Sequence, residues 1–469
     1  MKSKIVLAIL CCVFMANAAT PEELEKENEL LKARVEKLEN DIAQIKEMLM
    51  TQNSAATVEK AEITAKETSV EKTIAKDQKS AAIEKLNNET IEKLLALADE
   101  KPVEREVKPS DIDLDIYGFM RYDMAYDNSD VQSFFGGAGN GWALPENMDN
   151  NDDSFESTAR VSRFGIKAQC ESENGMLVNG VIEVDFCGGG SESSSELRMR
   201  HGYVKLDWPD SGFSLLAGQT WDVISPLYPT MVDAAVGWFS GNIGFRRPQL
   251  RLTQICQLNE DSSLELTGAI SRPADDSTYP TGTSSGPDSG QPNVQSRIAL
   301  TAPMFFNKKA TLGLSGHFGK DEHDFNTGGD EEQESWSFNV DFAQPINEQF
   351  TFKGEFFTGD NLDSYLGGIN QGVNRTTLEE IESVGGWASI CYKPLKKWLF
   401  NVGVAIEDLN SEDLNTGDRE YNQSTFANCI YLLDKHVSTG LELQHNRTEY
   451  KDSTNGNSTR AQMMIMYSF

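Results

Sequence analysis

Between residues 157 and 253, apolar and polar residues alternate at every second position in a series of short segments. A period of two is that of a β-strand, whose successive side chains point to opposite faces. In residues 176–187 one face carries Val178, Ile182, Val184 and Phe186, and the other carries Asn179, Glu183 and Asp185. The charged face must contact water, and the chain offers no second apolar layer to cover the apolar face. The pattern therefore predicts an all-β transmembrane barrel with an apolar outside and an aqueous lumen.

Strand-like segments follow one another from residue 114 to the end of the chain, and we count about sixteen. The connections are either long, such as residues 127–156 and 360–380, or short, such as residues 209–212 and 345–349. Long outer loops and short periplasmic turns alternate in outer-membrane barrels. The last segment places Tyr467 and the C-terminal Phe469 on one apolar face, which resembles the assembly signal of bacterial outer-membrane barrels. We therefore expect about sixteen antiparallel strands within residues 111–469.

The first 110 residues follow a different pattern. Residues 1–19 combine a basic start, an apolar core and a small-residue end, which predicts a signal peptide. Residues 20–50 repeat apolar residues every seven positions, which is typical of an α-helical coiled coil and less so of a single surface helix. The repeated residues are Leu24, Leu31, Leu38 and Ile45, with Val35, Ile42 and Leu49 four positions later in the repeat. Residues 51–110 are expected to form a partly helical, flexible linker to the barrel.

Composition excludes several classes of protein. A net charge of -31 with dispersed Lys and Arg argues against binding to nucleic acid. Mean hydropathy is -0.45, and no apolar run of about 18 residues follows the leader, so helical membrane spans are not expected. The five cysteines after the leader are scattered and show no metal-ligand spacing, and sequence assigns no disulfide. No catalytic motif is present, so we expect no enzyme activity, no metal and no cofactor.

Five short runs give the sequence a family resemblance. STARVSRFG, GVIEVDF, ELRMRHGYVKL, LLAGQTW and RRPQLRLT occur in this order within residues 157–253. They resemble the DcaP-like family of trimeric outer-membrane porins. The resemblance implies a periplasmic coiled-coil stalk, a sixteen-stranded barrel in the outer membrane and a homotrimer. It also implies uptake of small organic acids, often dicarboxylic.

The loop of residues 221–245 and the strands around it are the candidate site. This loop is unusually apolar, so it is expected to fold into the barrel and narrow it, or else to be buried at a subunit interface. Strand alternation points six cations to the lumen, namely Arg163, Lys167, Arg198, Arg200, Arg247 and Arg251. Four acids partly offset them, namely Glu183, Asp185, Asp222 and Asp233. The cations either attract anions at the narrowest point or form salt bridges that hold the loop.

Three further positions enter the prediction. Arg121 on the first strand shares the lumen face, and Arg246 lies near a strand end where alternation is least secure. Alternation points His201 to lipid or to an interface. The acids of the first long loop are expected to be solvated, and they are Asp127, Asp130, Glu146, Asp149, Asp152 and Asp153.

The sequence as a whole predicts an outer-membrane porin for passive diffusion of small polar solutes, preferring small organic anions such as dicarboxylates. One alternative is a structural protein that tethers the outer membrane to the cell wall through its stalk. Another is a general porin for cations or neutral solutes, if the four acids neutralise the wall. The expected partners are two further copies of the chain, outer-membrane lipid and organic anions, with the cell wall as a candidate partner of the stalk.

Overall fold

The computed structural model of the protein describes residues 112–148, 151–172, 174–189, 192–273, 283–324 and 330–469. The predicted signal peptide (1–19), coiled coil (20–50) and linker (51–110) lie outside the described residues. No helix in the described ranges is long and apolar enough to cross a membrane. The five cysteines of the described part are all free.

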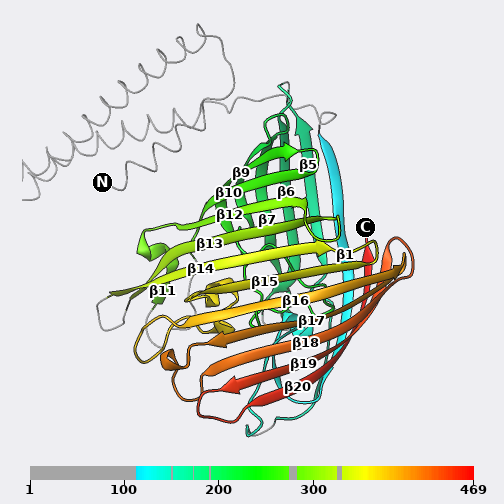
Figure 1. The fold of residues 1–469 in the computed structure, drawn as a ribbon. Coiled ribbons are helices and arrows are strands. Elements are labelled where there is room, and N and C mark those ends of the chain that lie inside the picture. Colours follow the sequence, from blue (N-terminus) through cyan, green and yellow to red (C-terminus); the bar gives the residue numbers. More distant parts are fainter. Residues whose placement is uncertain (1–111, 149–150, 173, 190–191, 274–282, 325–329) are drawn as a thin grey trace, which may run out of the picture. The chain divides into compact units, whose positions relative to one another are not determined.

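The described chain forms a closed antiparallel barrel (Figure 1). In chain order the barrel strands are β1 (Asp113–Asp127), β4 (Ser154–Thr158), β5 (Arg163–Glu171), β6 (Leu177–Gly188), β7 (Glu196–Trp208), β8 (Phe213–Trp221), β9 (Arg246–Asn259), β10 (Ser262–Ser271), β11 (Thr283–Ser285), β12 (Asn293–Pro303), β13 (Lys309–Asp324), β14 (Asp330–Pro345), β15 (Phe350–Asp360), β16 (Glu382–Leu395), β17 (Trp398–Leu409), β18 (Arg419–Leu432), β19 (Val437–Tyr450) and β20 (Gly456–Ser468). β1 pairs with β20 on one side and with β4 and β5 on the other, which closes the sheet.

The barrel has sixteen strands around its circumference, as the sequence predicted. The sheet contains 18 strand segments, but two of them share a place with a neighbour. β4 and β5 lie end to end along β1, and the short β11 lies beyond β12 on the same side of β13. Two segments are therefore not counted separately, and sixteen remain.

Side-chain alternation places apolar groups outside and polar groups inside. On β9, Leu250 and Leu252 are 43% and 37% exposed, whereas Gln249, the residue before Leu250, is buried. On β14, Phe338 is exposed while Asn339 and Asp341 are buried. This arrangement is the reverse of a soluble sandwich, and it is the one that a barrel needs in order to contact lipid outside and water inside.

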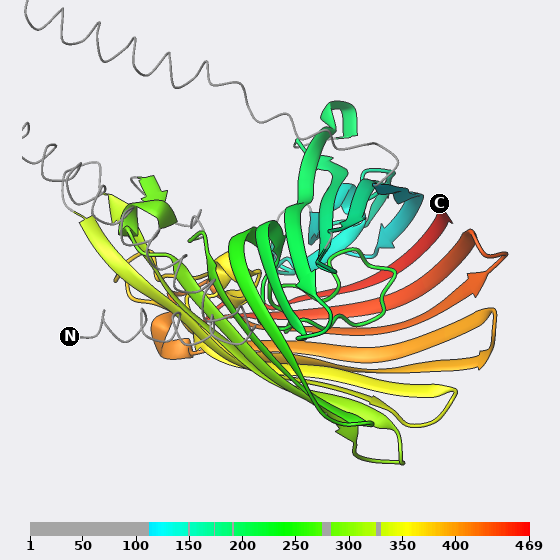
Figure 2. The ribbon, with the colours of Figure 1, turned by 90° about the horizontal axis from the view of Figure 1, so that it is seen from above.

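The loop after β8 (residues 222–245, the central loop) folds into the lumen, which Figure 2 shows enclosed by the curved sheet. Its backbone N–H groups donate to acceptors on the barrel wall: Val223 to Gln295 at 2.6 Å, Leu227 to Glu355 at 2.7 Å, and Val232 and Asp233 to Glu442 at 2.9 and 2.8 Å. Gly241 has φ +123, and a Cβ there would lie 2.3 Å from the carbonyl oxygen of Gly386 on β16. Glycine thus permits a close approach to the wall. The expected insertion is confirmed, and the alternative of a loop buried at a subunit interface is wrong.

Two further loops join the central loop in the lumen. The loop after β1 contains β2 (Val131–Phe134) and β3 (Gly139–Ala143), and all five residues of β3 are buried. Phe134 and Trp142 pack against Phe239 of the central loop, with ring centroids 4.8 and 5.7 Å apart. The loop of residues 361–381 contributes Ile369 and Ile381 to the same apolar cluster.

The expectation that the acids of the first long loop are solvated is therefore wrong for Asp127. This carboxylate is 1% exposed and binds Arg460 of β20 at 2.7 Å. Asp127 is the last residue of β1 and faces the lumen, so it meets the inner wall rather than water. The prediction missed this because the partner lies 333 positions away in the chain.

Candidate functional site

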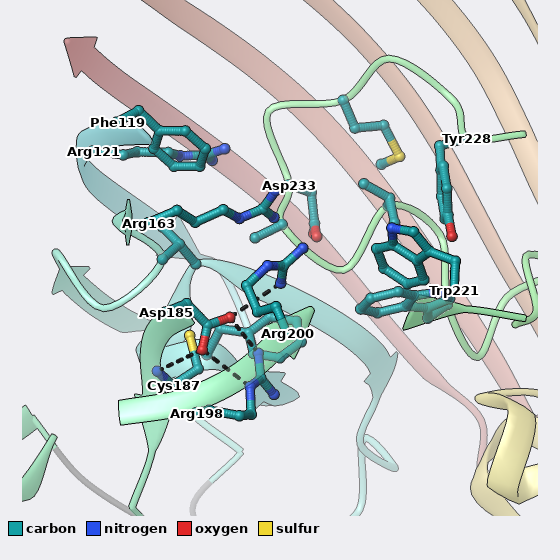
Figure 3. A pocket seen from close by; sticks show the side chains of 16 residues that line it. Phe119, Arg121, Arg163, Asp185, Cys187, Arg198, Arg200, Trp221, Tyr228 and Asp233 are labelled. Carbon is teal, nitrogen blue, oxygen red and sulfur yellow. Dashed lines mark hydrogen bonds and ion pairs between the residues drawn. The ribbon is translucent and has the colours of Figure 1, made fainter. Parts of the chain in front are cut away.

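A cavity of about 310 Å³ lies between the inner wall of strands β1, β5, β6 and β7 and the central loop. We call it the eyelet. The wall contributes Arg121, Arg163, Arg198 and Arg200 with Asp185, and the central loop contributes Met231, Asp233, Val236 and Trp238 together with Tyr228, beside Trp221 at the end of β8. Figure 3 shows the arginines on one side of the cavity and Trp221 and Tyr228 on the other.

A β-bulge lies at Arg200 and turns the next residue, His201, toward the lumen. Glu183 of β6 pairs with His201, but the next residue, Val184, pairs with Met199, so Arg200 is the extra residue of β7. A bulge interrupts side-chain alternation and aims side chains in a new direction. Arg200 is buried, and His201 also faces inward, with Nε2 3.8 Å from Glu183 and Nδ1 3.0 Å from the Thr220 hydroxyl. The prediction that His201 faces lipid or an interface is therefore wrong.

Three of the four wall arginines are held by carboxylates of the same wall. Arg198 binds Asp185 through two nitrogens, at 3.1 and 2.7 Å. Arg200 binds Glu183 at 2.7 Å and Asp185 at 3.1 Å. Arg121 binds Asp123 at 2.6 Å and also donates to the Val232 carbonyl of the central loop. Paired charges of this kind fix geometry, as fork-shaped guanidinium–carboxylate contacts do.

Two guanidinium groups lack an acidic partner. Arg163 lies over the Phe119 ring at 5.1 Å, and Arg246 lies over Trp221 and Phe245 at 4.5 and 4.6 Å. Arg163 Nε and Arg246 Nη1 are buried, and neither has a hydrogen-bond partner among the described residues. Counting Arg246, five guanidinium groups stand against Asp123, Glu183 and Asp185, which leaves an excess of 5 − 3 = 2 positive charges.

The charge state of Asp233 determines how much of this positive excess is neutralised. Its carboxylate accepts N–H groups of Asn140 and Ala235 at 3.0 and 2.6 Å, and it lies 4.0 Å from Arg460, which already binds Asp127. Burial in the central loop raises the pKa of Asp233 to about 7. The excess at the eyelet is therefore two charges below pH 7 and one charge above it.

The residues predicted from the sequence divide into two groups. Arg163, Arg198, Arg200, Asp185 and Asp233 line the eyelet, and Glu183 lies behind Arg200. Lys167, Arg247, Arg251 and Asp222 do not line it.

The second group has other contacts. Arg247 binds Asp222 at 2.8 Å and stacks on Tyr365 at 3.9 Å, and Arg251 donates to the Trp221 carbonyl, so both hold the base of the central loop. Lys167 lies 4.5 Å over the ring of Tyr117. The interpretation that the cations hold the loop thus applies to Arg247 and Arg251.

The prediction left the direction of Arg246 open and omitted the aromatic side of the eyelet. Arg246 is at the start of β9, where alternation gives no direction, and only the fold shows that it stacks on Trp221. The sequence showed that the central loop is rich in apolar and aromatic residues. Composition alone does not show which part of the barrel wall these residues face. Among the described residues, no group of three or more potential ligand side chains could hold a metal ion.

Comparison with known proteins identifies the type of barrel. Residues 42–269 match the model of the DcaP outer membrane protein family. The solved outer membrane channel DcaP of Acinetobacter baumannii is 19% identical, covers 77% of this chain and 98% of its own, and has a TM-score of 0.63. An anion-selective porin from Comamonas acidovorans is 12% identical, covers 76% of this chain and 100% of its own, and has a TM-score of 0.50. No curated protein matches the sequence. The predicted resemblance to the DcaP outer membrane proteins is thus confirmed over residues 42–269, and the described chain has the β-barrel fold of the solved outer-membrane channels.

Proposed function

We propose that the protein is an anion-preferring porin through which small organic anions diffuse across the outer membrane. The observation that carries the proposal is a pair of guanidinium groups without a carboxylate partner among the described residues: Arg163, which lines the eyelet, and Arg246, which lies over Trp221 of its lining. Dicarboxylates are the class of solute that the family resemblance implies. The porin from Comamonas acidovorans is an anion-selective protein with a similar fold, so the fold is compatible with this preference.

The large negative net charge does not oppose the proposal. Charges exposed to water are screened beyond a Debye length of about 8 Å at physiological salt. At the eyelet, which measures about 310 Å³, charged side chains such as Asp185, Arg200 and Asp233 are buried, so their charges act through a lower effective dielectric than in bulk water. Local charge at the narrow point therefore decides selectivity, and that charge is positive at the eyelet.

We also propose that the protein is a homotrimer with the predicted coiled coil as a periplasmic stalk. Outward-facing apolar residues surround the barrel, and they include Met120, Leu441 and Leu443 at 61–66% exposure. Such a surface must be covered by lipid or by other copies of the chain. In planar bilayers a trimer gives conductance steps in groups of three, whereas a membrane that stays sealed after verified insertion would support the tether instead.

The first prediction tests the unpaired charge. Arg163→Gln is expected to lower the anion-to-cation permeability ratio by about fivefold, because one charge about 8 Å away acts with about 1 kcal/mol at an effective dielectric of about 40. Reversal potentials in a KCl gradient measure the ratio. Lys167→Gln is the matched control, since Lys167 does not line the eyelet. A wild type that prefers cations, or equal effects of the two substitutions, would contradict the proposal.

The second prediction concerns pH. Asp233 loses its charge as pH falls through about 7, which raises the positive excess from one to two. The anion-to-cation ratio is therefore expected to rise by about fivefold between pH 8.5 and pH 5.5, by the same charge arithmetic. Asp233→Asn should hold the high ratio at both pH values. Glu442 accepts a hydrogen bond from the Asp233 backbone N–H. If the ratio of the Asp233→Asn variant still changes with pH, Glu442 rather than Asp233 is the titrating group.

A further inference from the structure

We infer that the eyelet favours carboxylates that carry an aromatic or apolar body over linear dicarboxylates. The inference rests on the proposed anion channel and names the class of solute at its narrow point. The observation behind it is the chemical difference between the two sides of the cavity (Figure 3). One side presents guanidinium groups, two of which lie over the rings of Phe119 and Phe135, and the other presents the rings and apolar chains of the central loop and Trp221.

The apolar side is continuous. The ring centroids of Trp221 and Tyr228 are 5.2 Å apart, and those of Trp221 and Trp238 are 6.1 Å apart. Met231 and Val236 extend the same side. Aromatic rings pack against each other with a preference for offset and edge-to-face geometry, so a planar ring of a solute finds compatible neighbours here.

The loops that form the apolar side contribute no cation, although Arg246 of β9 lies over the Trp221 ring at 4.5 Å. Residues 128–153 and 222–245, the two loops that face the arginines, contain no Lys or Arg in the sequence. Within the described lining, Asp233 is the carboxylate that the central loop places at the cavity. A linear dicarboxylate with one end at the arginines would direct its other end toward rings and an acid. A carboxylate buried against such groups pays a desolvation cost without a compensating partner.

Each side has an unused donor. Arg163 Nε on the arginine side and Nε1 of Trp238, which is 4% exposed, are buried without a hydrogen-bond partner among the described residues. Both residues line the eyelet. A carboxylate can accept from the guanidinium side while the body of the solute lies along the rings, and the indole N–H can meet a polar substituent on that body. This arrangement satisfies groups that otherwise remain unpaired.

The test measures how organic anions block the KCl current of the purified full-length protein in planar bilayers. Benzoate is expected to half-block the current at about two- to tenfold lower concentration than acetate or succinate, which is the range of a single aromatic contact. Benzamide, which has the ring but no charge, should block more weakly than benzoate. Equal half-blocking concentrations for benzoate, acetate and succinate would overturn the inference, and so would equal block by benzamide and benzoate.

Two variants locate the effect. Tyr228→Leu is expected to reduce the advantage of benzoate over acetate, whereas Lys167→Gln, outside the eyelet, should leave it unchanged. Met231→Lys adds a cation to the apolar side and should shift the preference toward succinate. An unchanged order of solutes in both Tyr228→Leu and Met231→Lys would overturn the inference.

The outcomes separate the inference from the function on which it rests. If the wild type shows anion preference in the KCl gradient but no advantage for benzoate, the inference fails and the anion porin stands. If the wild type prefers cations, the proposed function itself fails.

Discussion

Replacing Arg198 and Arg200 together with alanine is expected to turn anion preference into cation preference at pH 8. At that pH, Asp233 is ionised, and the eyelet of the wild type carries an excess of one positive charge. The double substitution removes two cations and leaves Glu183 and Asp185 without their partners, so the excess becomes one negative charge. Two charges of about 1 kcal/mol each correspond to roughly 30-fold in the permeability ratio, measured by reversal potential in a KCl gradient.

A charge-neutral control separates electrostatics from loss of structure. Arg200→Gln combined with Glu183→Gln removes the ion pair of 2.7 Å but leaves the local charge balance as it was. This variant should keep anion preference, although its conductance can change because the pair also shapes the wall. Anion preference that persists in the Arg198→Ala, Arg200→Ala protein would show that selectivity is set elsewhere in the lumen.

The barrel could be predicted because its signal is local and repeated. In a strand, alternate side chains meet lipid and lumen, so a short window of sequence already shows both faces. Leu250 and Leu252 on β9 and Phe338 on β14 are exposed as alternation requires. Sixteen such segments, separated by loops of two lengths, gave the strand count without knowledge of any long-range contact.

The eyelet could be predicted only in part, because alternation gives the side of the sheet but not the depth along the strand. Arg247 and Arg251 face the lumen as expected, yet they lie at the base of the central loop rather than at the eyelet. The bulge at Arg200 breaks the alternation on which the direction of His201 depended. A bulge is set by the pairing of two strands, so the residues of one strand do not reveal it.

The filling of the lumen could not be predicted, because it depends on contacts between distant parts of the chain. The first long loop looked like an exposed acidic loop, but Phe134 and Trp142 pack on the central loop and Asp127 binds Arg460. Local composition is similar for a solvated acid and for an acid that meets a buried guanidinium. Only the closure of β1 on β20 brings the two residues together.

That closing contact has the largest expected effect on stability. Arg460 and Asp127 are 1% and 2% exposed and are joined at 2.7 and 2.9 Å, and Arg460 also donates to the Gly137 carbonyl of the first loop at 3.0 Å. Arg460→Met is expected to lower the free energy of unfolding by about 3–5 kcal/mol, because it leaves a buried carboxylate without its cation. Urea unfolding in lipid vesicles, followed by tryptophan fluorescence, measures the change.

Two comparisons test whether the unpaired Asp127 carboxylate causes the expected loss of stability in Arg460→Met. Arg460→Met combined with Asp127→Asn removes both charges and should recover much of the loss, since a neutral amide is less costly to bury than a carboxylate. Arg447→Met breaks an exposed pair with Glu449, whose side chains are 50% and 35% exposed, and should cost less than about 1 kcal/mol. If the double variant is no more stable than Arg460→Met alone, the lost stability comes from the contact of Arg460 with the first loop and not from the unpaired carboxylate of Asp127.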